Sequence, residues 1–272
     1  MPRQARIDAP GAVHHVIVRG IERRKIFLDD QDRSSWIARL EKILIENKTP
    51  CFAWALMSNH VHLLLRTGLA PLSTVMRRLL TGYAVNFNRR HKRHGQLFQN
   101  RYKSILCQED PYLRELVGYI HLNPLRAGLV KDIAGLDRYP FSGHSALMGH
   151  QDRPWQDTGY VLRLFSERKS TARRRYREFV EKETSKGKRP ELVGGGLIRS
   201  LGGWQPVKLL RKGGQRIKGD ERILGDSSFV GEVLTASQDE LERKAEYRQK
   251  GYDFDWLVER VARLLEMKMD EG

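Results

Sequence analysis

Two histidines separated by one residue are the side chains whose type and spacing could do chemistry. His60 and His62 lie in the apolar run MSNHVHLLLRTG. Residues at i and i+2 of a β-strand point to the same face, so the two imidazoles are expected side by side. Such a pair makes a partial site for a divalent metal ion. The alternative is a pair of polar side chains on a solvated sheet face.

A tyrosine and an asparagine follow about sixty residues later, in GYIHLNPLRAGLV. Tyr119 and Asn123 are at i and i+4, so they share one face of a helix, and Gly118 is expected to leave space beside the tyrosine. The Tyr119 phenol is a nucleophile only when it is activated, for example by a metal-polarised phosphate; the alternative is a core tyrosine. His121 points away and is interpreted as structural or DNA-facing.

Two imidazoles and one amide oxygen leave coordination positions open. Zinc prefers four tight nitrogen or sulfur ligands, and no further cysteine or histidine cluster supplies them. The set therefore favours a labile Mg²⁺ or Mn²⁺ ion that also takes water and phosphate oxygens.

Charge points to a polyanionic partner. The chain of 272 residues has 49 Lys and Arg against 33 Asp and Glu, a formal net charge of +16. Nucleic acid is the first candidate and an anionic membrane surface the second. No apolar run approaches the ~20 residues of a membrane-spanning helix. The start of the chain has no apolar signal segment, and Cys51 and Cys107 are interpreted as buried free thiols, so a cytoplasmic, nucleoid-associated protein is expected.

The apolar pattern predicts elements that would position these residues. They are a strand over 14–21, a helix over 29–48, strands over 51–58 and 60–68, a helix over 71–93, a strand over 95–108 and a helix over 110–128. Pro124 is expected to bend the last helix at Asn123. This β-α-β-β-α-β order is the split βαβ, ferredoxin-like pattern of the α+β class. Helices are expected on one sheet face, and the other face is expected to stay available for a site.

The pattern of residue types changes near residue 150. This change predicts a domain over 1–149 and an accessory, basic and mainly helical region over 150–272. Two short helices are expected over 157–190, and helices over 227–249 and 251–269. The stretch 186–226 is rich in Gly, Lys and Arg, with little core of its own.

Basic residues interleaved with aromatic residues recur in the segments 19–27, 85–95 and 98–104. Cationic side chains can bind phosphates while aromatic rings stack on unpaired bases, which favours single-stranded or hairpin DNA. Each segment alone could be an ordinary solvated face, and Arg126 could be a plain surface arginine. The candidate DNA-binding residues are Arg19, Arg23, Arg24, Arg89, Arg90, Lys92, Arg101, Lys103 and Arg126.

These motifs resemble a known family. MSNHVHLLL, YIHLNPLRAGLV, RGIERRKIFLDD and GQLFQNRYKSILC are similar to segments of the REP-associated tyrosine transposases, within the wider IS200-like transposases of the HUH endonuclease superfamily. The resemblance covers roughly residues 1–147. It implies a ferredoxin-like domain that cuts and rejoins single-stranded DNA near imperfect hairpins. GDERILGDSSFV also resembles accessory segments of longer members.

The resemblance implies a role for each site residue. His60, His62 and Asn123 would be metal ligands. Tyr119 would attack the metal-polarised scissile phosphate, giving a 5′-phosphotyrosine and a free 3′-OH, and a second transesterification would rejoin strands. The expected assembly is a monomer or homodimer. The alternatives are a domesticated, non-catalytic hairpin-DNA-binding protein and an RNA-binding module that uses the same sheet face.

Overall fold

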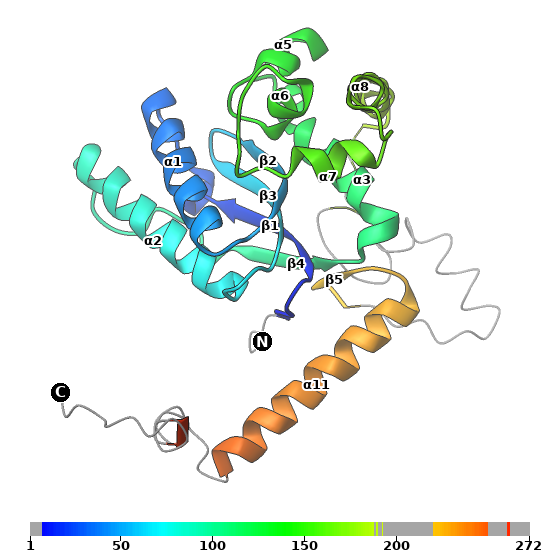
Figure 1. Ribbon diagram of the computed structural model, residues 1–272. Helices are drawn as coiled ribbons and strands as arrows, with labels where there is room; N and C mark the ends of the chain where they lie inside the picture. The colour runs from blue at the N-terminus through cyan, green and yellow to red at the C-terminus, as the bar shows by residue number, and fades with distance from the viewer. Residues whose placement is uncertain (1–6, 188, 190–191, 193–219, 250–259, 262–272) are drawn as a thin grey trace. The chain divides into compact units, whose positions relative to one another are not determined.

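The structure is a computed structural model, and it describes residues 7–187, 189, 192, 220–249 and 260–261 (Figure 1). The chain divides into two compact units, Met1–Asp226 and Ser227–Gly272. The first unit carries every predicted site residue.

A five-stranded sheet forms the centre of the first unit. Its strands are β1 (Val13–Arg19), β2 (Cys51–Leu56), β3 (His60–Arg66), β4 (Lys103–Cys107) and β5 (Ile223–Leu224), in the order β2-β3-β1-β4-β5. The first four pair with one another in antiparallel fashion, which confirms the ferredoxin-like prediction. The sequence did not indicate β5, which pairs parallel with β4.

Helices α1 (Asp30–Glu46) and α2 (Leu72–Arg90) cover one face of this sheet, as predicted (Figure 1). The side chain of Asp29 caps α1 by accepting a hydrogen bond from the backbone N–H of Asp32. The apolar stripes of both helices pack on the β3 side chains Val61, Leu63 and Leu65. This is the face opposite to His62, so these two helices hold the strand from the side away from the histidines.

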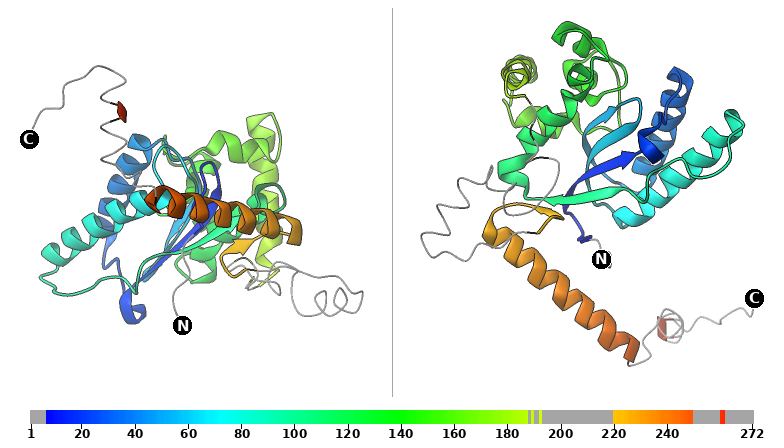
Figure 2. Two further views of the ribbon diagram at one scale, coloured as in Figure 1. Left: turned by 90° about the horizontal axis from the view of Figure 1, so that it is seen from below. Right: turned by 180° about the vertical axis from the view of Figure 1, so that it is seen from behind.

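The other sheet face is also covered over β2, so the expectation that it stays available is wrong there. Helix α3 (Glu109–His121) and the helices that follow it lie on this side (Figure 2). They bury Phe52, Ala55 and Leu64. The physical reason is that β2 is apolar on both faces and needs a second layer.

The helices that follow α3 complete this second layer. They are α4 (Asn123–Arg126), α5 (Ile133–Arg138), α6 (Gly143–Met148), α7 (Thr158–Arg163) and α8 (Lys169–Thr184). Helices α7 and α8 confirm the two helices predicted over 157–190. Because α7 packs on β2 and α8 on α3, this compact unit extends past the predicted boundary at 149/150.

Strand β4 is shorter than the predicted strand over 95–108. In the segment before it, Phe98 makes only an isolated bridge to Gly20, which lies next to the short 3-10 helix η1 (Ile21–Arg23). Gly95 and Asn100 have positive φ, which interrupts an extended strand.

The second unit contains α11 (Ser227–Gln249), which confirms the helix predicted over 227–249. The helix predicted over 251–269 and most of the stretch 186–226 lie outside the described residues. None of the helices in the described part of the chain combines the length and apolar character needed to cross a membrane.

Candidate active site

His60 and His62 lie on β3 with their side chains on the α3 side of the sheet. The apolar residues between and after them alternate to the opposite face, as predicted. The ring centroids are 5.1 Å apart, at 78°. His62 is buried and His60 is partly exposed, so the pair opens to the surface at its His60 end. The two imidazoles are therefore side by side, as the spacing predicted.

His15 joins this pair from the neighbouring strand. In the β1–β3 register Ile17 pairs with His62 and Leu64 pairs with His15, so the two histidines are diagonal neighbours on one face. Nε2 of His15 lies 2.9 Å from Nδ1 of His62, and Nδ1 of His15 lies 3.1 Å from the carbonyl oxygen of Leu192. The sequence interpretation missed His15, although its place in a predicted strand could have indicated it.

The histidines of this cluster are held neutral. Burial lowers the pKa of His15 to about 4, and burial together with the charge of Arg19 lowers the pKa of His60 to about 4. Burial, helped by the neighbouring His15 and His60, lowers the pKa of His62 well below its ordinary value. A neutral imidazole keeps the nitrogen lone pair that a metal ion binds.

Tyr119 comes to the same place from α3. Its ring centroid is 5.9 Å from that of His62 and 6.1 Å from that of His15, both in edge-on arrangements. Tyr119 is partly exposed, whereas Leu116, Val117 and Ile120 of the same helix are buried against the sheet. The side chain is thus at the rim of the apolar layer rather than within it, which favours the site interpretation over that of a core tyrosine.

Gly118 has a different role from the predicted one. The space beside it is filled by Phe179 of α8, because a Cβ atom at Gly118 would lie 2.7 Å from Cε1 of that ring. The glycine therefore allows α8 to approach α3 closely, next to Tyr119.

Asn123 begins the short helix α4, after α3 has ended at His121, so the predicted bend at Pro124 is present. Its amide nitrogen donates to the carbonyl oxygens of Tyr119, at 3.0 Å, and Ile120, at 3.2 Å. These bonds hold the side chain at the end of the helix that carries Tyr119. They use the amide N–H groups, and leave the oxygen as the atom suited to a cation.

Arg126 reaches back over Tyr119. Its guanidinium carbon is 5.5 Å from the centroid of the tyrosine ring, and Nη2 donates to the carbonyl oxygen of Glu183 at 3.3 Å. Nε and Nη1 are buried without a hydrogen-bond partner among the described residues. Burial lowers the pKa of Arg126. Two unused donors next to a tyrosine could bind a phosphate oxygen. This arrangement favours the phosphate-binding interpretation of Arg126 over that of a plain surface arginine.

His60, His62 and Asn123 could hold a divalent ion. Within the described residues no three His, Cys, Asp or Glu side chains gather into a metal-binding group. A donor set of two neutral imidazoles and one amide oxygen would fit an ion that keeps water or phosphate oxygens in its other positions.

Seven of the nine predicted DNA-binding residues fall into two exposed groups. Arg19, Arg23 and Arg24 lie exposed at the end of β1 and in η1 and its cap, beside the His60 end of the site, although Arg24 pairs with Glu22 at 2.9 Å. Exposed Arg89, Lys92, Arg101 and Lys103 lie at the end of α2 and along the segment that leads into β4.

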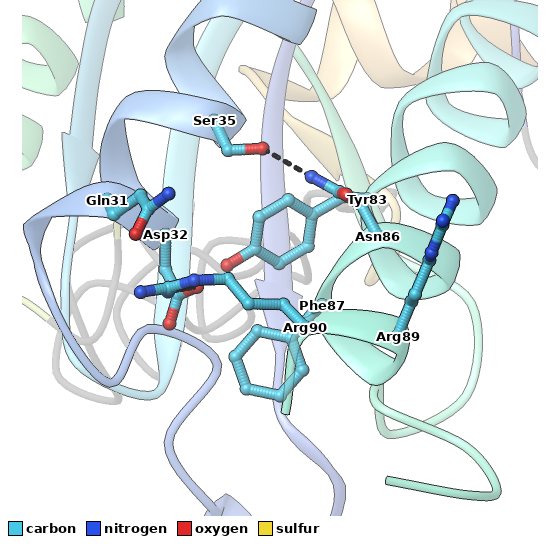
Figure 3. A pocket seen from close by; sticks show the side chains of 8 residues that line it. All are labelled: Gln31, Asp32, Ser35, Tyr83, Asn86, Phe87, Arg89 and Arg90. Carbon is cyan, nitrogen blue, oxygen red and sulfur yellow. Dashed lines mark hydrogen bonds and ion pairs between the residues drawn. The ribbon is translucent and has the colours of Figure 1, made fainter. Parts of the chain in front are cut away.

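Arg90 differs from its neighbour Arg89. Its guanidinium donates to Asp29 at 2.6 Å and also bonds the buried carboxylate of Asp32, which accepts from His91 at 2.9 Å. Asp32 and Arg90 border a cavity of about 370 Å³ between α1 and α2 (Figure 3). Figure 3 shows Arg90 directed at Asp32 and Arg89 directed elsewhere. Arg90 therefore ties α2 to the start of α1.

Comparison with known proteins finds one matching family model and similar solved structures. The family model described as "Transposase IS200 like" matches residues 10–123. A structure of a REP-associated tyrosine transposase bound to a REP hairpin is 19% identical, with a TM-score of 0.45, and covers 58% of this chain and 98% of its own. A transposase-like protein from Deinococcus radiodurans R1 is 17% identical, with a TM-score of 0.31, and covers 44% of this chain and 92% of its own. No curated protein matches the chain.

Proposed function

We propose that this protein, whose residues 10–123 match the model of the IS200-like transposases, is a metal-dependent single-strand DNA endonuclease and strand transferase that acts on hairpin DNA. One observation carries the proposal: the Tyr119 ring lies 5.9 Å from that of His62, which is beside His60 on the same strand face. A nucleophile and a cation site are the two parts that phosphate transesterification needs.

Each residue has a role in the proposed reaction. A bound Mg²⁺ or Mn²⁺ ion, held by His60, His62 and Asn123, would supply charge stabilisation at the scissile phosphate. Arg126, whose guanidinium lies over the Tyr119 ring, would orient the same phosphate. The Tyr119 oxygen forms a bond to phosphorus and loses its proton to solvent, while the bond from phosphorus to the 3′ oxygen breaks and that oxygen takes up a proton. The products are a 5′-phosphotyrosine and a free 3′-OH.

The reaction then reverses on a second strand. A 3′-OH attacks the phosphotyrosine, the bond between phosphorus and the Tyr119 oxygen breaks, and the phenol is regenerated. The number of phosphodiester bonds is conserved, so the reaction needs no nucleotide cofactor. The net charge of +16 and the exposed cations beside His60 favour a single-stranded or hairpin DNA substrate.

A covalent adduct tests the proposal. The full chain is incubated with Mn²⁺ and single-stranded hairpin DNA from the host's own repeats, labelled at either end, and the products are separated on a denaturing gel. We expect a protease-sensitive adduct on the 5′ end of the downstream fragment, absent in Tyr119→Phe and reduced in His60→Ala. Tyr112→Phe, on the same helix two turns earlier, is the matched control and should keep the adduct.

The charge of the chain also suits a non-catalytic hairpin-binding protein, and the same gel decides between the two. If the protein binds hairpin DNA tightly but forms no adduct with any repeat tested, the nuclease proposal is rejected in favour of a non-catalytic hairpin-binding protein. An adduct that persists in Tyr119→Phe would reject the assigned nucleophile.

A further inference from the structure

Both proposed metal-binding histidines make a hydrogen bond through Nδ1, and in both cases the partner leads to a backbone carbonyl group. Nδ1 of His62 lies 2.9 Å from Nε2 of His15, and Nδ1 of His60 lies 2.7 Å from Oδ1 of Asn59. A carbonyl oxygen only accepts hydrogen bonds, which makes it possible to assign the direction of each bond along the way.

The first hydrogen-bond relay runs from the Leu192 carbonyl group through His15 to His62. The carbonyl oxygen of Leu192 accepts from Nδ1 of His15 at 3.1 Å, so that nitrogen carries a proton. His15 is wholly buried, and a buried imidazole between a carbonyl group and a second imidazole is neutral. Nε2 of His15 is then unprotonated and accepts. His62 must therefore donate from Nδ1, which leaves a lone pair on its Nε2.

The second hydrogen-bond relay runs from the Arg23 carbonyl group through Asn59 to His60. The carbonyl oxygen of Arg23 accepts from Nδ2 of Asn59 at 2.9 Å, and this bond determines which end of the amide is the oxygen. Oδ1 of Asn59 faces Nδ1 of His60 and can only accept. His60 must therefore also donate from Nδ1, and its Nε2 also keeps a lone pair.

We propose that His15 and Asn59 are positioning residues that hold His62 and His60 in the Nδ1–H tautomer, so that both histidines present Nε2 to a divalent cation. A partner that accepts from the second nitrogen of a metal-binding histidine fixes the ring orientation and raises the basicity of the ligand. The inference rests on the metal role proposed for His60 and His62, and it deepens that role.

The hydrogen bond from His15 to Leu192 also gives the chain after residue 150 a role in positioning the proposed metal ligands. The Leu192 carbonyl belongs to a segment anchored by Arg189, which donates to Glu115 of α3 at 2.8 Å and to Glu183 of α8 at 3.1 Å. The buried His15 ring thus links this later segment to the proposed metal site. The domain that resembles the family does not complete the site by itself.

Long-range nitrogen–proton NMR of the full chain, without metal or DNA, reads the tautomers directly. In the wild-type protein we expect the proton of His60 and of His62 on Nδ1. His15→Phe should move the His62 proton to Nε2 and leave His60 unchanged, whereas Asn59→Ala should do the reverse. Each variant is therefore the folding control of the other. A wild-type protein with either proton on Nε2 would overturn the proposal.

A Mn²⁺ titration followed by electron paramagnetic resonance measures the consequence. His15→Phe and Asn59→Ala should each weaken Mn²⁺ binding by roughly 10–100-fold. His15→Gln should bind more tightly than His15→Phe, because an amide can accept from His62 and donate to Leu192. His14→Phe is the matched control: His14 is equally buried on the same strand, but its Nδ1 is 3.2 Å from Ser104 Oγ and not near His62.

The two proposals can fail separately. Mn²⁺ affinity unchanged in both His15→Phe and Asn59→Ala would reject the positioning roles even if DNA cleavage is observed. Nδ1–H tautomers with the expected losses of affinity, but no covalent adduct on DNA, would uphold the positioning roles and reject the nuclease.

Discussion

The Tyr176 hydroxyl lies 2.8 Å from Nδ1 of His121, two residues after the proposed nucleophile in α3. The same hydroxyl lies 2.6 Å from Nδ1 of His144, whose Nε2 lies 2.8 Å from a carboxylate oxygen of Asp137. His121, Tyr176 and His144 are all buried. Because the carboxylate accepts from His144, Tyr176 donates to His144 and accepts from His121. His121 is thus structural: it attaches the end of α3 to α8 and α6.

Removing the Tyr176 hydroxyl should loosen this attachment. Tyr176→Phe leaves the buried N–H of His121 and the acceptor nitrogen of His144 without their partner, at a cost of about 1–3 kcal/mol in the free energy of unfolding. Urea denaturation measures the loss. Tyr139→Phe is the control, because the hydroxyl of this partly buried tyrosine makes no hydrogen bond within the described part of the chain; equal losses in the two variants would contradict the assignment.

The contact between Gly118 and Phe179 should be equally sensitive. Gly118→Val places branched carbon atoms where the Phe179 ring lies, so α8 must move away from α3. The expected cost is about 1–3 kcal/mol of unfolding free energy, with a smaller yield of covalent adduct. In a double-mutant cycle, Phe179→Ala should remove much of the cost. Additive effects of the two substitutions would show that the ring does not limit position 118.

Stability should fall on mild acidification because buried histidines must take up protons when the chain unfolds. Burial lowers the pKa of His14 to about 4 and also lowers that of His144. Their contribution is fully present above the unfolded pKa, near 6.5, and is lost as the pH falls toward the folded pKa. Each histidine contributes up to about 1.4 kcal/mol per pH unit in that window.

Urea unfolding in EDTA at pH 7.5, 6.5, 5.5 and 5.0 tests this dependence without metal binding. We expect a flat region above pH 7 and a decline below pH 6.5, with a shallower decline in His14→Gln. Stability that is constant down to pH 5 would contradict the burial of these imidazoles in the neutral form.

Arg89 and Arg90 should respond differently to the same substitution. Arg89→Gln should weaken binding of single-stranded DNA and reduce the salt dependence of the binding constant by a slope of about 1, as expected for one lost phosphate contact. Arg90→Gln should instead lower the melting temperature, since Asp32 is buried and loses an ion-pair partner. Fluorescence anisotropy over a salt series and thermal denaturation measure the two effects. The reverse outcome would place Arg90 at the DNA.

The sequence by itself determined the order of the strands and helices from β1 to α3 and the two clusters of chemical groups. Alternation in the HVHLLL run predicted which face carries His60 and His62, because strand side chains alternate regardless of what surrounds the strand. The Asn123-Pro124 step likewise predicted the break after α3, since proline restricts the residue before it. These are local effects, and they were confirmed in the structure.

Only the tertiary structure decided which distant groups complete the site. The pairing of β1 with β3 brings His15 to His62, 47 positions apart, and the chain after residue 150 brings the Leu192 carbonyl to His15, 177 positions apart. It also decided that Arg90 is held by Asp29 and Asp32, whereas its neighbour Arg89 is directed elsewhere. The periodicity of apolar residues along the sequence does not predict these contacts. Strand register and packing between layers depend on the whole set of buried surfaces and not on neighbours in the chain.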